Sequence, residues 1–355
     1  MSSLHTWSWI GQRKPTTELL EERRCPSTVH FEGGTLVVIG TQGADTVSIK
    51  DDGQGGLAVT FDNTAHNGNG NGSHGSNEDN DDQGGDNNDQ GDDNNNSNVS
   101  NGSNGSNGGT TGPTTENFTG VERVVFVGMG GDDDFSYTLS GEMTTDREIR
   151  ANLGDGNDTA TLDFGAGVNG AQLEVDASGG KGDDTVDATV GAVTDADVDL
   201  SARLGAGADN LTAALTGDVT GDSQVKFDVD GGRDNDTLGF NLAGKIDADA
   251  DMKIEADGGR GDDAITATYT GVVDGTLDLQ LDGGKGDDMV SGTVTADAAS
   301  TGEVSAVAKG GRGDDDVTLN IDAPAAVDVT GLLDGGRGTD TCVATSNVDV
   351  KNCEM

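Results

Sequence analysis

The segment Gly258–Thr266 reads GGRGDDAIT, and three further blocks of the chain are nearly identical to it. They are GGKGDDTVD at Gly179–Asp187, GGKGDDMVS at Gly283–Ser291 and GGRGDDDVT at Gly310–Thr318. Weaker copies align with these four when the sixth position of the block is used as a ruler. That position is aspartate in all ten copies: Asp45, Asp133, Asp158, Asp184, Asp209, Asp236, Asp263, Asp288, Asp315 and Asp340. Self-similarity of this kind predicts a repeat architecture.

The spacing of these aspartates predicts how the chain is divided. From Asp133 onward successive copies lie 25 to 27 residues apart, whereas the first step, from Asp45 to Asp133, is 88 residues. The long step contains residues 62–117, built almost wholly from Asn, Gly, Asp and Ser, which we expect to be a disordered insertion in the first rung. The predicted division is a polar, disordered leader at 1–26, a first rung at 27–61, the insertion at 62–117, and a repeat array with a C-terminal cap at 118–355.

The residues between blocks predict two strands per repeat. Each block is followed by a short alternating strand, a variable turn and a second alternating strand. The apolar side falls on Leu238, Phe240 and Leu242 or Val317, Leu319 and Ile321 in the first strand, and on Val225, Phe227 and Val229 or Leu277, Leu279 and Leu281 in the second.

A unit of this length cannot close a core alone and is too short for a propeller blade of ~40 to 45 residues, so rungs must stack on one another. We therefore predict an all-β parallel β-roll or β-solenoid of about ten rungs, whose equivalent strands pair at ~4.8 Å.

Composition narrows the possible partners. Asp and Glu number 65 against 20 Lys and Arg, a net charge of -45, which disfavours nucleic acid and anionic membrane surfaces. Of these acids 52 are Asp and only 13 are Glu, which points to turns or metal binding, because adaptation to high salt would enrich Glu as well. No apolar stretch long enough to insert in a membrane is present.

Cysteine and histidine give little sign of catalysis. Cys342 and Cys353 lie 11 residues apart and either clamp the last turn as a disulfide or remain two free thiols; Cys25 is left unpaired. All four histidines precede the regular array, so no histidine-based catalysis or zinc site can be built within it. Carboxylate pairs occur at almost every turn and lack the single split environment of a hydrolase. We expect a protein that is not an enzyme.

The block satisfies G-G-x-G-x-D-x-U-x and resembles the RTX, or haemolysin-type calcium-binding, repeat family. This resemblance implies that Ca²⁺ binds between stacked turns, through the sixth-position carboxylates and the carbonyls of the glycine loop. The metal-binding candidates are the fifth- and sixth-position acids Asp133, Asp158, Asp183, Asp184, Asp209, Asp236, Asp262, Asp263, Asp287, Asp288, Asp314, Asp315 and Asp340.

Two departures from the family pattern reduce the expected number or strength of the sites. Here the block occurs once per 25 to 27 residues instead of in tandem, so only one edge of the roll should carry calcium. The third position is basic in six copies: Lys181, Arg233, Arg260, Lys285, Arg312 and Arg337.

A physical argument also favours a cation. Stacked carboxylates ~5 Å apart repel by ~0.8 kcal/mol in bulk water and by ~3 kcal/mol at an effective dielectric near 20. Calcium accepts six to eight oxygen ligands in flexible geometry, which suits glycine turns better than magnesium does.

These observations favour an extracellular, calcium-binding structural or adhesive β-roll with cell-surface or matrix components as partners. The segment from Glu18 to Thr28 and the repeat after it resemble the N-terminal leader of exported planctomycete proteins, which implies a location at the cell surface or outside it. Two alternatives stay open. One is a secretion or targeting module of a toxin- or enzyme-like exported system. The other is binding to ice or a crystal surface, because the outward position after the block is Ser or Thr at Ser48, Ser136, Thr161, Thr212, Thr266, Ser291 and Thr318.

Overall fold

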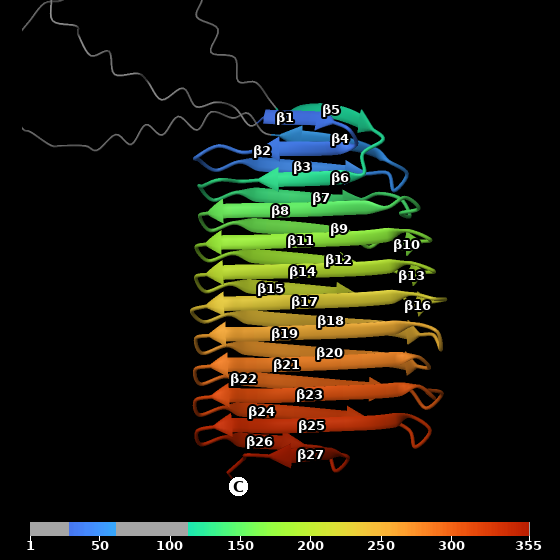
Figure 1. Ribbon diagram of the computed structural model, residues 1–355, viewed down its shortest axis with the longest axis vertical. Coiled ribbons are helices and arrows are strands. Elements are labelled where there is room, and N and C mark those ends of the chain that lie inside the picture. The colour runs from blue at the N-terminus through green and yellow to red at the C-terminus, as the bar shows by residue number, and fades with distance from the viewer. Residues whose placement is uncertain (1–27, 62–112, 355) are drawn as a thin grey trace, which may run out of the picture.

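The computed structural model describes residues 28–61 and 113–354. Over these ranges the chain winds into a solenoid in which successive strands alternate between two facing sheets (Figure 1). The predicted class, an all-β solenoid with two main strands per rung, is confirmed. The predicted leader at 1–26 and residues 62–112 of the predicted insertion lie outside the described residues.

Sheet 1 has twelve strands. In spatial order they are β1 (Thr28–Glu32), β2 (Thr35–Ile39), β6 (Arg123–Val127), β8 (Arg147–Asp155), β11 (Gln172–Lys181), β14 (Asp197–Ala206), β17 (Gln224–Arg233), β19 (Asp251–Arg260), β21 (Thr276–Lys285), β23 (Glu303–Arg312), β25 (Asp328–Arg337) and β27 (Val348–Lys351).

Sheet 2 lies behind sheet 1 in the view of Figure 1. From the N-terminal end its strands are β5 (Thr114–Thr119), β4 (Gly56–Phe61), β3 (Thr46–Asp51), β7 (Asp134–Leu139), β9 (Thr159–Phe164), β12 (Thr185–Val190), β15 (Asn210–Leu215), β18 (Thr237–Ile246), β20 (Ala264–Val273), β22 (Met289–Ala296), β24 (Asp316–Asp322) and β26 (Thr341–Ala344). Three short strands at the edge away from the blocks complete it: β10 (Val168–Asn169), β13 (Val193–Thr194) and β16 (Val219–Thr220).

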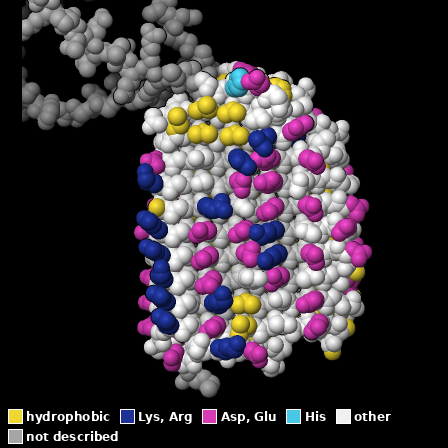
Figure 2. All heavy atoms as spheres, in the orientation of Figure 1, with side chains coloured by type: hydrophobic (Ala, Val, Ile, Leu, Met, Phe, Trp, Pro, Cys, Tyr) yellow, Lys and Arg dark blue, Asp and Glu magenta, His cyan; other side chains and the backbone are white. Residues whose placement is uncertain are grey.

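Neighbouring rungs pair in parallel and in register. Val175 of β11 pairs with Leu200 of β14, which pairs with Phe227 of β17, so equivalent positions lie directly above one another. Outward side chains therefore form columns along the long axis, and Figure 2 shows such columns of acidic side chains over sheet 1. Within the described ranges, the chain has no helix with the length and apolar character needed to cross a membrane.

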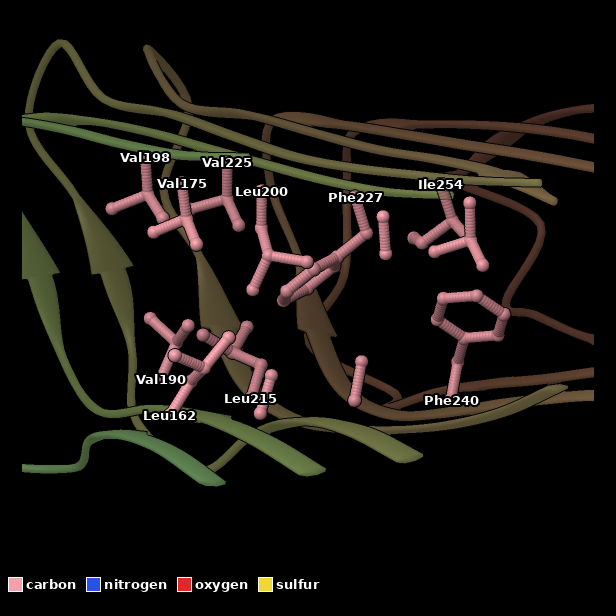
Figure 3. Packing of buried hydrophobic residues seen from close by; sticks show 14 of the residues in the cluster. Leu162, Val175, Val190, Val198, Leu200, Leu215, Val225, Phe227, Phe240 and Ile254 are labelled. Atoms are coloured by element: carbon pink, nitrogen blue, oxygen red, sulfur yellow. The ribbon is translucent and has the colours of Figure 1, made fainter. Parts of the chain in front are cut away.

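The core is a thin apolar layer between the sheets. Side chains from sheet 1, such as Val198 and Phe227, face Leu215 and Phe240 of sheet 2 (Figure 3). The rings of Phe227 and Phe240 lie 6.5 Å apart. All twelve inward residues named from the alternation are at most 4% exposed, so the period-two pattern located both faces correctly.

The N-terminal end differs from the predicted first rung. β1 pairs with β2, β3 with β4, and β4 with β5, all antiparallel. Residues 114–117, predicted to belong to the insertion, are part of β5, so that boundary was wrong. Their sequence TTEN continues into FT, and threonine and phenylalanine suit a strand whose backbone can bond to β4.

A buried ion pair joins this antiparallel end to the parallel rungs. Arg147 and Asp51 are at most 2% exposed, and Nε of Arg147 lies 2.9 Å from Oδ2 of Asp51. The hydroxyl of Tyr137 also donates to Asp51, and the guanidinium donates to the carbonyl of Val121. Strands β3, β7 and β8 thus meet at one charged contact, which the sequence pattern did not single out.

Candidate metal site in the stacked aspartate turns

The ten blocks form the turns that lead from sheet 1 into sheet 2, all at one edge of the solenoid. Gly259 and Gly261 have φ angles of 96° and 139°, which side chains other than glycine rarely adopt. Gly258, at the first position, is required for a different reason. A Cβ there would lie 2.6 Å from Oδ2 of Asp263 and 2.7 Å from the carbonyl oxygen of Gly283. The turn therefore brings two oxygens from adjacent rungs to the same glycine.

The sixth-position aspartates form a buried column that we call the inner ladder. Each is at most 7% exposed, and nine of the ten are at most 2% exposed. The backbone N–H of Asp263 donates to Oδ1 of Asp288 at 2.8 Å, and the N–H of Asp288 donates to Oδ1 of Asp315 at 2.8 Å. The same bond links every successive pair from Asp45 to Asp340, at 2.7 to 3.0 Å.

In nine of the ten inner-ladder aspartates the second carboxylate oxygen is buried without a hydrogen bond, whereas Oδ2 of Asp45 accepts the N–H of Thr41. Within the described ranges these nine are Asp133, Asp158, Asp184, Asp209, Asp236, Asp263, Asp288, Asp315 and Asp340. A buried polar atom without a partner is costly, and most such atoms in native proteins are satisfied by protein groups, water or an ion. The row of Oδ2 atoms is therefore the best candidate site in the described chain.

Burial raises the pKa of eight inner-ladder carboxyls, because the charged form loses its hydration; they are Asp133, Asp158, Asp184, Asp209, Asp236, Asp263, Asp288 and Asp315. The pKa rises to about 7 in Asp133, Asp184, Asp236 and Asp288, and to about 6 in Asp209. The backbone N–H bond to Oδ1 lowers it, whereas neighbouring aspartates raise it further. In the absence of a cation, these five carboxyls therefore take up protons near neutral pH.

The fifth-position side chains form a second, exposed column, the outer ladder. Here the direction is reversed, because the side chain accepts the N–H of the following rung. Asp287 N–H donates to Oδ1 of Asp262, and Asp314 N–H donates to Oδ1 of Asp287, both at 2.9 Å. Asn157 and Asn235 accept in the same way, at 3.0 and 2.9 Å. Asp183, Asp262, Asp287 and Asp314 thus serve the turn backbone, a role that the asparagines among them could have indicated.

The weaker copies adopt the same turn. Asp209 and Asp236 belong to the inner ladder although their blocks read LGAGAD and GGRDND. Asp234 replaces a loop glycine and has a φ of 75°. Leu153 and Leu204 stand at the first position, where other blocks have glycine, and both are fully buried. In those two rungs an apolar side chain takes the place of the glycine beside Oδ2 of Asp158 and Asp209.

No protein-family model, curated protein or solved structure matches this chain. The arguments for a function accordingly rest on the geometry of the turns.

The turns fit calcium only when backbone oxygens contribute. In residues 28–61 and 113–354, no group of three or more His, Cys, Asp or Glu side chains could by itself hold a metal ion. The unpaired Oδ2 and the carbonyl oxygen of the next rung are hard donors of the kind calcium prefers. They converge at Gly128, Gly179, Gly231, Gly258, Gly283, Gly310 and Gly335. The rungs of Asp158 and Asp209 fit less well because of the leucines.

The Ser and Thr positions proposed for ice binding lie in one column of equivalent positions on sheet 2. The column is interrupted by Asp187 and Gly239, and its longest unbroken runs are three residues, such as Thr266, Ser291 and Thr318. Such short runs do not make the extended regular surface that binding to ice or a crystal requires.

Proposed function

We propose that this protein is a non-enzymatic calcium-binding β-solenoid that serves as a structural or adhesive element outside the cell, as its resemblance to RTX repeats implies. The observation that supports this most is the row of nine buried Oδ2 atoms without hydrogen bonds. Calcium would supply positive charge to carboxylates that otherwise retain protons.

The chain's own residues have distinct parts in this proposal. In the nine inner-ladder aspartates from Asp133 to Asp340, Oδ1 accepts a backbone N–H and fixes the carboxylate, which leaves Oδ2 for the ion. Glycine at the first position keeps the space beside Oδ2 open. The outer ladder holds successive turns in register, so that carbonyl oxygens of adjacent rungs can take part.

Calcium titration of the full chain tests this proposal. In excess chelator the inner ladder has either protons or unscreened charge, and binding energy becomes folding energy where the site forms only on folding. We expect far-ultraviolet circular dichroism to change from coil to β as calcium rises through roughly 10⁻⁴ to 10⁻³ M, the range of extracellular modules. An unchanged β spectrum in chelator, together with no heat of calcium binding by calorimetry, would refute it.

A pair of variants separates ligation from general charge. Asp263→Asn retains an oxygen for the N–H of Asp236 but removes the anionic ligand, so calorimetry should show fewer or weaker calcium sites. Asp187→Asn is the matched control, because the Asp187 side chain is exposed on β12 and, within the described ranges, forms no side-chain hydrogen bond or ion pair. Asp274 is less suitable, since it accepts from Thr301 and pairs with Lys245. Equal changes in calcium binding in the two variants would show that acidic side chains over the whole surface, and not the inner ladder, bind calcium.

A further inference from the structure

Five cations stand one above another on consecutive rungs of the edge that carries the turns. This basic column consists of Arg233, Arg260, Lys285, Arg312 and Arg337, each paired in register with the next along sheet 1. All five side chains are exposed, and Figure 2 shows a dark blue column along this edge of the molecule. In a chain with a net charge of -45, a run of adjacent cations needs a physical explanation.

The column is not neutralised by ion pairs. Two and three rungs before Arg233, the same column contains Lys181 and Asp155, which form an ion pair at 2.8 Å. Among the described residues, the five members of the basic column form no ion pair, although twelve ion pairs occur elsewhere. Like charges ~4.8 Å apart repel one another, so the column is poised for an external anion at each rung.

A shallow furrow lies beside the column. Its floor consists of Gly232, Gly259 and Gly284, stacked in register without side chains, and its basic wall consists of Arg260, Lys285 and Arg312. Asp257 and Asp282 form the opposite wall, while the outer ladder runs on the other side of the column. The positive surface is therefore one residue wide, long, and bordered by negative charge on both sides.

This shape selects the class of partner. A bilayer or a nucleic-acid duplex is broad and would meet the acidic borders together with the cations. A single nucleic-acid strand is narrow, but proteins that bind one add aromatic side chains for base stacking, and the furrow has no aromatic residue in its lining. We infer that the basic column binds an extended acidic polysaccharide, one with a carboxylate or sulfate on each sugar, whose groups recur on the scale of the rungs.

This inference deepens the adhesive part of the proposed function and rests on it, but it does not depend on calcium ligation by the inner ladder. The two can therefore fail separately. Calcium ions that bridge the acidic surface and a polysaccharide would contribute equally to binding by two variants with the same net charge, so a difference between such variants reports on the basic column.

Two triple variants of the full chain test the inference by binding to immobilised polygalacturonate and dextran sulfate. Calcium is held constant, circular dichroism checks the fold, and neutral dextran serves as the blank. The first variant neutralises the column by Arg260→Gln, Lys285→Gln and Arg312→Gln. The second removes the same charge from already paired cations by Lys226→Gln, Lys245→Gln and Lys253→Gln.

We expect the column variant to bind both acidic polymers at least tenfold more weakly, and the control variant to change binding less than twofold. Equal losses would overturn the inference, as would absence of binding by the parent protein. Tighter binding of single-stranded DNA, or of vesicles with anionic lipids, through the same three residues would assign the column to another partner. Sedimentation completes the test. If the parent protein is a dimer and only the column variant is a monomer, the partner of the basic column is a second copy of the chain.

Discussion

Single aspartates in the inner ladder are subject to two opposed effects. The N–H of the preceding rung stabilises the carboxylate at Oδ1, whereas burial of Oδ2 favours the protonated acid or a bound cation. Asparagine would satisfy the first effect equally well. Aspartate at all ten positions is consistent with a requirement for the second oxygen as an anion.

The identity of these residues was predictable, but their contacts were not. The ten regularly spaced copies of the block identified every sixth-position aspartate, because spacing and composition can be read from the sequence. The use of Oδ1 for a backbone N–H depends on how a turn stacks on the next one, and an isolated block has no such neighbour. The sequence argument that the row requires cations was therefore incomplete, since backbone N–H groups already stabilise one oxygen of each pair.

First-position glycine gives a prediction at this scale. Alanine at Gly283 would place Cβ 2.6 Å from the carbonyl oxygen of Gly310 and 2.7 Å from Cβ of Asp288, so the turn must shift. We expect Gly283→Ala to lower the free energy of unfolding by about 1 to 3 kcal/mol, the usual cost of overpacking, in urea denaturation. The control is Gly239→Ala, whose Cβ would approach nothing closer than 3.6 Å. If both variants have the parent's stability, the first position does not need its space.

At the scale of elements, the rung was predictable and the ends were not. Alternation identifies which face of a strand is buried, and the repeat period identifies which strands stack. Neither reveals that the backbone reverses direction in β4 and β5, because antiparallel and parallel strands show the same alternation. The short strands β10, β13 and β16 were missed because two residues carry no readable period.

The β4–β5 hairpin gives the second prediction. Phe61 at the end of β4 pairs with Thr114 at the start of β5, so the two ends of the intervening segment are already adjacent. Replacing residues 63–112 by a short Gly-Ser linker closes the same hairpin, and the closure entropy changes only slowly with loop length. The melting temperature with calcium should stay within about 5 °C of the parent. A larger fall would show that the segment contributes to stability.

At the scale of the whole molecule, many raised carboxyl pKa values give stability a definite pH dependence. The folded pKa of Asp133, Asp184, Asp236 and Asp288 is about 7, against 3.8 for the ordinary group. The folded state then binds more protons than the unfolded state between these values, so stability is full below about pH 4 and is lost as the pH rises through 7. In chelator we expect the melting temperature to fall from pH 4 to pH 8.

Calcium and a single substitution test the origin of this slope. Calcium should abolish most of the fall, because it replaces the protons. Asp288→Asn should reduce the fall in chelator and raise stability at pH 8, by roughly 4 kcal/mol at most, the equivalent of its pKa shift. At pH 4 it should have little effect. A flat profile in chelator, or an unchanged slope in the variant, would show that the inner ladder is not what titrates.

The C-terminus supplies a substitute for one more rung. The N–H of Asp340 has no following aspartate and donates instead to Oε2 of Glu354 at 2.7 Å, while the N–H of Glu354 donates to the carbonyl of Asp340 at 3.2 Å. The disulfide between Cys342 and Cys353 holds this segment against the last turn, which resolves the two alternatives for these cysteines. The final strands β26 and β27 are four residues each, against ten for β25.

A stack of similar rungs does not limit its own length, since the unpaired strand edges of each rung can pair with another rung. The last strands of this solenoid are short and are tied down by the disulfide, so they offer a second molecule little edge with which to pair. Opening the disulfide by reduction, or deleting residues 345–355, should leave the ten-residue strand β25 as the edge of sheet 1, through which two molecules can pair as a dimer that sedimentation detects. Chains that remain single after both treatments would show that the solenoid is closed by other means.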